Sequence, residues 1–503
     1  MTTTHPTHPF SSIGELLEAL TGIARIREDR EPAHAGIEIL DVAAFRDGLI
    51  DRLIATAVFG EGPERDAARW VIRVAAPALG AWPASIHALY MAAGRGEYAN
   101  RTAPAINVRG LAYDTMRAIY RAARANDCKI MLFELARSEM SYTQQRPAEY
   151  ASNALAAAIK EGHQGPVFIQ GDHYQISAKN WASDPDRERD ALHELTAEAI
   201  TAGYFNIDID SSTIVDVSLP TLAEQQQLNA HLTALFTEFI RDQEPAGVTV
   251  SIGGEIGEVG QRNSTVQELH AFMTAFMNEL QERERQLGRD LVGISKISVQ
   301  TGTSHGGVVL PDGTIADVAV DFETLKELSE VARIDYGLGG AVQHGASTLP
   351  EVAFGRFAEA NAIEVHLATA FQNQIFEHAA FPTDLKDEIY AYLSANHADE
   401  RKAGQTDAQF FYGARKRAFG PFKRQMWDMP AETRDRIADD LEASFGQLMQ
   451  RLGVASSGDL VDRLVPRVDV NAPMPAALTA TLAGEVVMAG VGAEATLEEV
   501  EGE

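Results

Sequence analysis

The chain has 503 residues, of which 45% are hydrophobic, and a formal net charge of −29. This length suits one α/β barrel of about 250–300 residues with additions at both ends. The negative charge and the lack of a dense basic patch exclude a typical nucleic-acid-binding protein and predict a solvated acidic surface.

Residues 1–95 are predicted to form a helical extension, because "IGELLEALTGIARI" and "VAAFRDGLIDRLIATAVF" carry apolar residues at helical spacing. The opening "MTTTHPTHPFSSIGE" lacks the basic and apolar regions of a signal peptide. No run of about 18 apolar residues predicts a membrane span. The one cysteine, Cys128, allows no intrachain disulfide. We therefore expect a cytoplasmic protein that does not bind membranes.

Over residues 96–385, short apolar runs alternate with amphipathic stretches such as "AYDTMRAIYRAARAN". This alternation predicts parallel strands joined by helices, and eight strands close a (β/α)8 TIM barrel. An open doubly wound sheet is the alternative, but it usually carries a glycine fingerprint after its first strand, and "AINVRG" has none. The runs are "APAINV", "KIMLFEL", "PVFIQGDH", "YFNIDID", "GVTVSIGGE", "ISVQTGTSH", "GGAVQHGAS" and "AIEVHLAT".

Residues 386–472 are predicted to be a C-terminal helical region. In it, "MPAETRDRIADDLEASFGQLMQRLGV" is an amphipathic helix with proline near its start and glycine near its end. Residues 473–503 are small and acidic, and they predict a disordered tail.

Polar residues stand at the ends of the predicted strands, and in a TIM barrel these ends form the active-site face. Such residues at nearly every strand end are hard to explain by core packing. They are Asn107, Glu134, Asp172, His173, Asp208, Asp210, Glu255, His305, His344 and His366.

Three histidines, His173, His305 and His344, end separate strands beside a glycine or an acid. A single histidine of this kind is more often structural, but three that converge with an open fourth position describe a catalytic zinc site. Glu255 is a further candidate ligand, with a solvated loop acid as its alternative interpretation.

Glycines follow two of these histidines, and they leave backbone N–H groups accessible to a ligand. With a hydroxyl and a helix N-terminus nearby they predict a phosphate cradle, although tight turns explain single glycines equally well. The candidate cradle residues are Gly306, Gly345, Ser347 and Thr369.

Five stretches resemble the class II, zinc-dependent ketose-bisphosphate aldolases over roughly residues 95–385. They are "PAINVRG", "QGDHYQ", "IDSS", "TSHGG" and "HGAST", in the order and spacing of that family. The resemblance implies a carbon–carbon lyase in which the metal polarises a ketone and stabilises the enediolate left when the C3–C4 bond breaks. It also implies a sugar phosphate substrate and a homodimer or homotetramer.

The resemblance also assigns roles to individual residues. His173, His305 and His344 hold one zinc ion per subunit, with a monovalent cation as a further candidate cofactor. Asp172 is the acid/base; its side chain is expected to leave the strand in a different direction from that of His173, outside the ligand set. The implied substrate-binding residues are Asn107, Asp210, Gly306, Gly345, Ser347 and Thr369.

Several features depart from that family. His366 stands where the family has asparagine, "GEIGEVGQRN" leaves Glu258 as a displaced candidate base, and no basic residue follows "SHGG". These departures predict a substrate with one anionic group, which His366 would help to bind. A metal-dependent sugar epimerase or isomerase, favoured by His366, and a non-catalytic aldolase partner subunit remain the alternatives to an aldolase.

Overall fold

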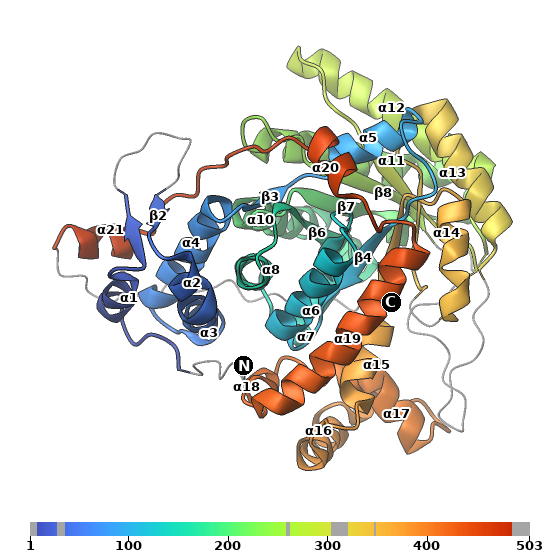
Figure 1. Ribbon diagram of the computed structural model, residues 1–503. Coiled ribbons are helices and arrows are strands. Elements are labelled where there is room, and N and C mark those ends of the chain that lie inside the picture. Colours follow the sequence, from blue (N-terminus) through green and yellow to red (C-terminus); the bar gives the residue numbers. More distant parts are fainter. Residues whose placement is uncertain (1–7, 28–35, 258–261, 303–319, 347–348, 485–503) are drawn as a thin grey trace.

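The computed structural model describes residues 8–27, 36–257, 262–302, 320–346 and 349–484 (Figure 1). Its centre is a closed barrel of parallel strands, in which each strand pairs with the next and the last pairs with the first. The predicted TIM barrel and all eight predicted strands are confirmed. The strands are β4 (Ala103–Asn107), β5 (Leu132–Ala136), β6 (Gly165–Gln175), β7 (Asn206–Asp210), β8 (Ser251–Gly257), β9 (Lys296–Val299), β10 (Ala341–Gln343) and β11 (Glu364–Leu367).

Helices surround the barrel because its strands are buried on both faces and turn apolar side chains outward. The helices of this layer are α6 (Ala112–Ala125), α7 (Arg137–Thr143), α8 (Pro147–Glu161), α9 (Ala178–Ser183), α10 (Pro185–Ala202), α11 (Leu222–Gln243), α12 (Val266–Leu287), α13 (Phe322–Tyr336), α14 (Gly355–Glu359) and α15 (Thr369–Glu377), with 3-10 turns at Ser212–Ile214 and Glu351–Ala353.

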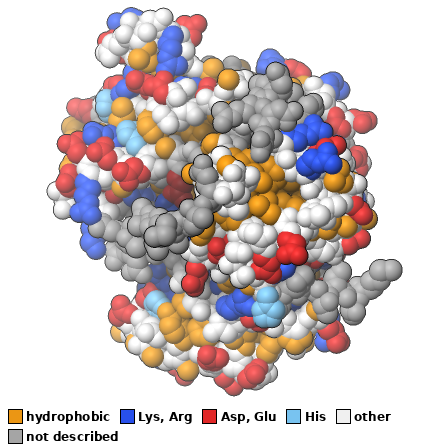
Figure 2. All heavy atoms as spheres, turned by 90° about the vertical axis from the view of Figure 1, so that its left-hand side faces the viewer, with side chains coloured by type: hydrophobic (Ala, Val, Ile, Leu, Met, Phe, Trp, Pro, Cys, Tyr) orange, Lys and Arg blue, Asp and Glu red, His pale blue; other side chains and the backbone are white. Residues whose placement is uncertain are grey.

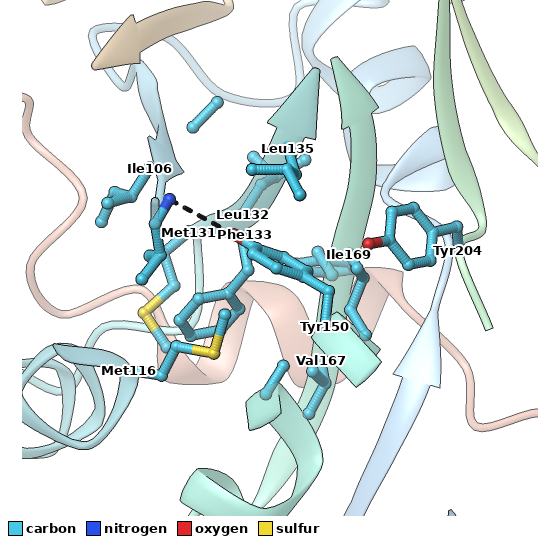
Figure 3. Close-up of a cluster of buried hydrophobic side chains, with 14 of the residues drawn as sticks. Ile106, Met116, Met131, Leu132, Phe133, Leu135, Tyr150, Val167, Ile169 and Tyr204 are labelled. Atoms are coloured by element: carbon cyan, nitrogen blue, oxygen red, sulfur yellow. Dashed lines mark hydrogen bonds between the residues drawn. The ribbon is translucent and has the colours of Figure 1, made fainter. Parts of the chain in front are cut away.

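Helix α8 packs against strands β5 and β6 through a cluster of buried side chains (Figure 3). Tyr150 of α8 is fully buried and lies among Leu135 and Ile169. Its hydroxyl donates to the backbone oxygen of Glu134 at 2.5 Å. This hydrogen bond connects α8 to β5 at Glu134, whose side chain contacts Gln170 in the barrel interior.

The N-terminal region contains more than the helices predicted for it, because three short strands also form there. β1 and β2 make a separate antiparallel pair, and β3 joins the barrel sheet. The elements are α1 (Ile13–Leu20), β1 (Ala24–Ile26), β2 (Ile37–Ile39), α2 (Val42–Ala44), a π-helix (Phe45–Leu49), α3 (Ile50–Phe59), α4 (Pro63–Ala78), β3 (Ala81–Ala84) and α5 (His87–Gly94).

Strand β3 pairs in parallel with the first part of β6, from Gly165 to Phe168, and β7 pairs with the later part. The side chain of Asn206, the first residue of β7, links β7 to β3. It donates to the backbone oxygen of Ala84 and accepts from the backbone nitrogen of Ile86. The chain then continues into α5, which packs against residues 337–339 where the chain enters β10. The N-terminal region therefore closes the amino end of the barrel.

The C-terminal region is helical as predicted, and the predicted amphipathic helix is α19, which begins after Pro430 and ends before Gly453. It packs along α6, where Arg434 lies 3.3 Å from Asp114. The helices are α16 (Thr383–Asn396), α17 (Asp407–Ala414), α18 (Lys423–Trp427), α19 (Ala431–Arg451), α20 (Gly458–Leu464) and α21 (Ala476–Leu482), with 3-10 turns at Ala398–Glu400 and Arg415–Ala418.

The last helix differs from the expected disordered tail, because α21 lies within residues 473–503. Its Leu478 is fully buried, and the helix packs beside α1 and α4 (Figure 1). Within the described ranges, no helix is long and apolar enough to cross a bilayer. Acidic and basic side chains are interspersed on the face that Figure 2 shows.

Candidate active site

A break in the pairing of β6 brings two polar side chains into one site. The register between β6 and β7 shifts between Gly171 and Tyr174, which marks a β-bulge. His173 within it has a φ of 39°, a strained value for a residue with a side chain. Regular alternation would send Asp172 and His173 to opposite faces. The bulge instead leaves Asp172 Oδ1 3.7 Å from His173 Nε2, so the expected divergence of these side chains was wrong.

Three histidines from different strand ends meet at the carboxyl end of the barrel. The ring of His344, which follows β10, lies 4.1 Å from that of His173 and 4.0 Å from that of His366, between centroids. His344 and His366 are each 6% exposed. Two of the three predicted zinc-binding histidines are therefore together, and His366 joins them from β11.

Carboxylates surround His173 on its other side. Its Nδ1 lies 3.2 Å from Asp210 Oδ2 and 3.1 Å from Glu255 Oε2. Burial, together with the nearby charges of Asp210 and Asp172, raises the pKa of Glu255 to about 7. Asp210, although buried, has a lowered pKa because it pairs with His173 and accepts hydrogen bonds from Ser212.

These side chains fit a divalent metal ion. Ligand atoms of Asp172, His173 and His344 lie within 4.8 Å of one another, and so do those of His173, Asp210 and Glu255. Imidazole nitrogens with carboxylate oxygens are the ligands that zinc and similar ions take in catalytic sites. The raised pKa of Glu255 also indicates crowded negative charge, which a divalent ion would neutralise.

Three other predicted substrate-binding residues, Asn107, Gly345 and Thr369, lie at or just after the carboxyl ends of β4, β10 and β11. Asn107 ends β4, and its amide donates to Glu139 of α7 at 2.5 Å. Gly345 follows His344 directly with a φ of 69°, a left-handed conformation that suits glycine. Thr369 is the first residue of α15, at the carboxyl end of β11. The remaining predicted residues, Glu258, His305, Gly306 and Ser347, lie outside the described residues.

Two charged residues in the barrel interior, Lys296 and Glu364, were not singled out in the sequence, although each stands within a short apolar strand. Glu364 precedes His366 by two residues on β11 and therefore faces the same side, and Lys296 begins β9. Both are buried, with exposures of 0% and 1%. Charged residues inside short apolar strands are rare unless they are paired, so these two could have been recognised.

The carboxyl end of this barrel thus holds clustered histidines and acids able to bind a metal. The sequence of the chain matches the family model of class-II fructose-bisphosphate aldolase over residues 84–420. The chain belongs to this family. No curated protein sequence matches it.

Solved structures align with this class-II aldolase family member at low sequence identity. The fructuronate-tagaturonate epimerase UxaE from Cohnella laeviribosi aligns with a TM-score of 0.51 at 12% identity, over 87% of this chain and 90% of its own. The YdjI aldolase from Escherichia coli K12 has a TM-score of 0.43 at 12% identity, covering 75% and 99%. The fructose-bisphosphate aldolase of Campylobacter jejuni has a TM-score of 0.42 at 14% identity, covering 75% and 96%.

Proposed function

We propose that the chain is a metal-dependent enzyme that cleaves the C3–C4 bond of a ketose phosphate, or of a related sugar, by retro-aldol chemistry. The observation that carries the proposal is the grouping of Asp172, His173 and His344 within 4.8 Å at the carboxyl end of the barrel. This arrangement sets a buried acid beside two imidazoles that would bind the metal, and membership of the aldolase family supports the same chemistry.

His173 and His344 would hold the ion, with His305 as the third imidazole and Glu255 as a further ligand. Zinc suits this donor set. A divalent ion bound there acts as a Lewis acid that polarises the ketone of the substrate. Asp210 Oδ2 lies 3.2 Å from His173 Nδ1, on the same side of the ring as Glu255, and would help to orient the ring.

Asp172 is the proposed acid/base. In the cleavage direction it would take the proton of the substrate C4 hydroxyl as the C3–C4 bond breaks, and it would return the proton during condensation. Its Oδ1 lies 3.0 Å from His366 Nδ1, and it is 5% exposed.

The proposed substrate carries one phosphate or another single anionic group. Gly345, with Gly306 and Ser347, would supply backbone N–H groups for it, and Thr369 opens α15, whose N-terminus favours an anion. The acids around His173 would repel a second phosphate placed near the reacting carbons.

A sugar epimerase is the second candidate. The alignment with UxaE extends over 87% of this chain, beyond the residues 84–420 that match the aldolase family model. The same bond cleavage, followed by attack on the opposite face of the retained carbonyl fragment, inverts C4 without releasing products. His366 in place of the family asparagine favours this candidate.

The test begins with the metal content of the purified protein, followed by incubation with ketose monophosphates, ketose bisphosphates and ketouronates. Triose products, detected by a coupled assay, support an aldolase, whereas a C4 epimer seen by NMR without triose supports an epimerase. A protein that binds no divalent metal contradicts both. If kcat/KM for a bisphosphate exceeds that for the matched monophosphate by more than about tenfold, or about 1.4 kcal/mol, a second cationic site exists.

A further inference from the structure

A chain of buried polar side chains runs through the barrel interior beneath Asp172. Its base is Lys296 of β9, whose side chain is 1% exposed. The ammonium group donates to Gln170 Oε1 at 2.8 Å, to Asp208 Oδ2 at 2.9 Å and to Glu364 Oε1 at 2.6 Å. All three of its protons therefore have acceptors, each on a different strand.

Glu364 is the centre of this network. Its Oε1 accepts from Lys296, from Gln170 Nε2 at 2.8 Å and from His366 Nε2 at 2.6 Å. Its Oε2 accepts from the hydroxyl of Tyr90, which is fully buried on α5 of the N-terminal region. Gly253 leaves room for the Asp208 carboxylate, because a Cβ at this position would lie 2.4 Å from Asp208 Oδ1.

His366 links the network to the site. Its Nε2 faces Glu364, and its Nδ1 lies 3.0 Å from Asp172 Oδ1 and 3.1 Å from Glu134 Oε2. A carboxylate oxygen therefore lies within hydrogen-bond distance of each ring nitrogen, which fixes the orientation of the ring from both sides. Glu364 holds the ring from below, and Nδ1 faces Asp172.

We propose that Glu364, Lys296 and Tyr90 are positioning residues that hold His366 against Asp172. The N-terminal segment β3–α5 thereby contributes to the catalytic centre as well as closing the amino end of the barrel. The proposal rests on the proposed function for the role of Asp172, whereas the orientation of His366 stands on the hydrogen bonds alone.

A second group of possible metal ligands lies deeper in the barrel, at the place that Lys296 occupies. Ligand atoms of Glu134, Glu364 and His366 lie within 4.8 Å of one another. However, the ammonium of Lys296 already lies 2.6 Å from Glu364 and supplies a positive charge at that place. A flexible, compact ammonium with three donors serves three acceptors on separate strands.

Kinetics on the zinc-loaded full-length protein test the positioning role. Tyr90→Phe removes one hydroxyl, and we expect kcat to fall by about tenfold, equivalent to about 1.4 kcal/mol, with KM and metal content unchanged. In a Glu364→Gln background the same substitution should have no further effect, because the two act through one ring. The matched control is Tyr113→Phe, whose hydroxyl also donates to a buried carboxylate, Asp51, at 2.8 Å, but outside the barrel.

Spectroscopy provides a measurement that does not depend on substrate. In protein carrying ¹⁵N-labelled histidine, the imidazole nitrogen signals of His366 are assigned by their loss in His366→Asn. Glu364→Gln should shift the Nε2 signal, because that nitrogen lies 2.6 Å from Glu364 Oε1, while Tyr113→Phe leaves it unchanged.

The outcomes separate this proposal from the proposed function. An unchanged His366 spectrum in Glu364→Gln overturns the positioning role. Loss of metal together with kcat in Tyr90→Phe, or an equal loss in Tyr113→Phe, also overturns it in favour of general structural support. If no ketose is converted by the wild type but the spectra behave as expected, the proposed function fails and the positioning of His366 holds.

Discussion

Replacing Lys296 with methionine should strongly destabilise the protein. Methionine keeps much of the length of the side chain but leaves the carboxylates of Asp208 and Glu364 without the ammonium that now lies within 2.9 Å of each. Removing one partner of a buried ion pair costs about 3–5 kcal/mol.

The lowered pKa of Glu364 agrees with the direction of this effect. Burial opposes its ionisation, yet Lys296 and His366 hold its pKa at about 2, against an ordinary 4.5. That difference corresponds to about 3 kcal/mol in favour of the ionised carboxylate. We therefore expect the free energy of unfolding to fall by about 3–5 kcal/mol in Lys296→Met at pH 8.

The assay is urea unfolding of the metal-free protein, followed by circular dichroism at pH 8 and pH 5. Without the ammonium, the pKa values of both carboxylates rise, so protonation at pH 5 should relieve part of the destabilisation. The control is Lys326→Met, which breaks an exposed contact of 4.0 Å with Glu330 and should change stability by less than about 0.5 kcal/mol. A loss below about 1 kcal/mol in Lys296→Met at both pH values would refute the paired-charge interpretation.

Three further predictions concern the site itself. His344→Ala should lose both bound metal and activity while the circular dichroism spectrum is unchanged, and full metal occupancy by elemental analysis would remove His344 from the ligand set. Asp172→Asn should keep metal and KM while kcat falls by about 10²–10⁴; loss of metal would make Asp172 a ligand instead. Because the pKa of Glu255 is about 7 in the metal-free protein, zinc binding at pH 6 should release its proton, and affinity should rise until pH exceeds about 7. Calorimetry in buffers of different ionisation enthalpy measures this release, and an equal release by Glu255→Gln would assign the proton to another group.

The barrel and much of its active face could be predicted from the sequence because both depend on local patterns. Each apolar run forms one strand. Polar residues at the carboxyl end of a run therefore lie at the carboxyl rim of the barrel, and this does not depend on the other parts of the fold. This reasoning predicted that Asp172, His173 and His344 lie at the carboxyl end of the barrel, where the structure brings their side chains together. The amphipathic pattern of α19 was likewise enough to predict this helix, because helical periodicity is visible within the sequence of the helix itself.

The contacts across the barrel were decided only by the tertiary structure. Alternation along β6 predicted that Asp172 and His173 diverge, but the bulge opposite β7 directs both into the site. The pairing of Lys296 with Glu364, and of Tyr90 with the same carboxylate, joins residues 68 and 274 positions apart in the chain. In a strand without a bulge, local sequence specifies which side of the strand a residue faces. Which partner it meets depends on barrel closure and on the N-terminal segment that enters from the opposite end.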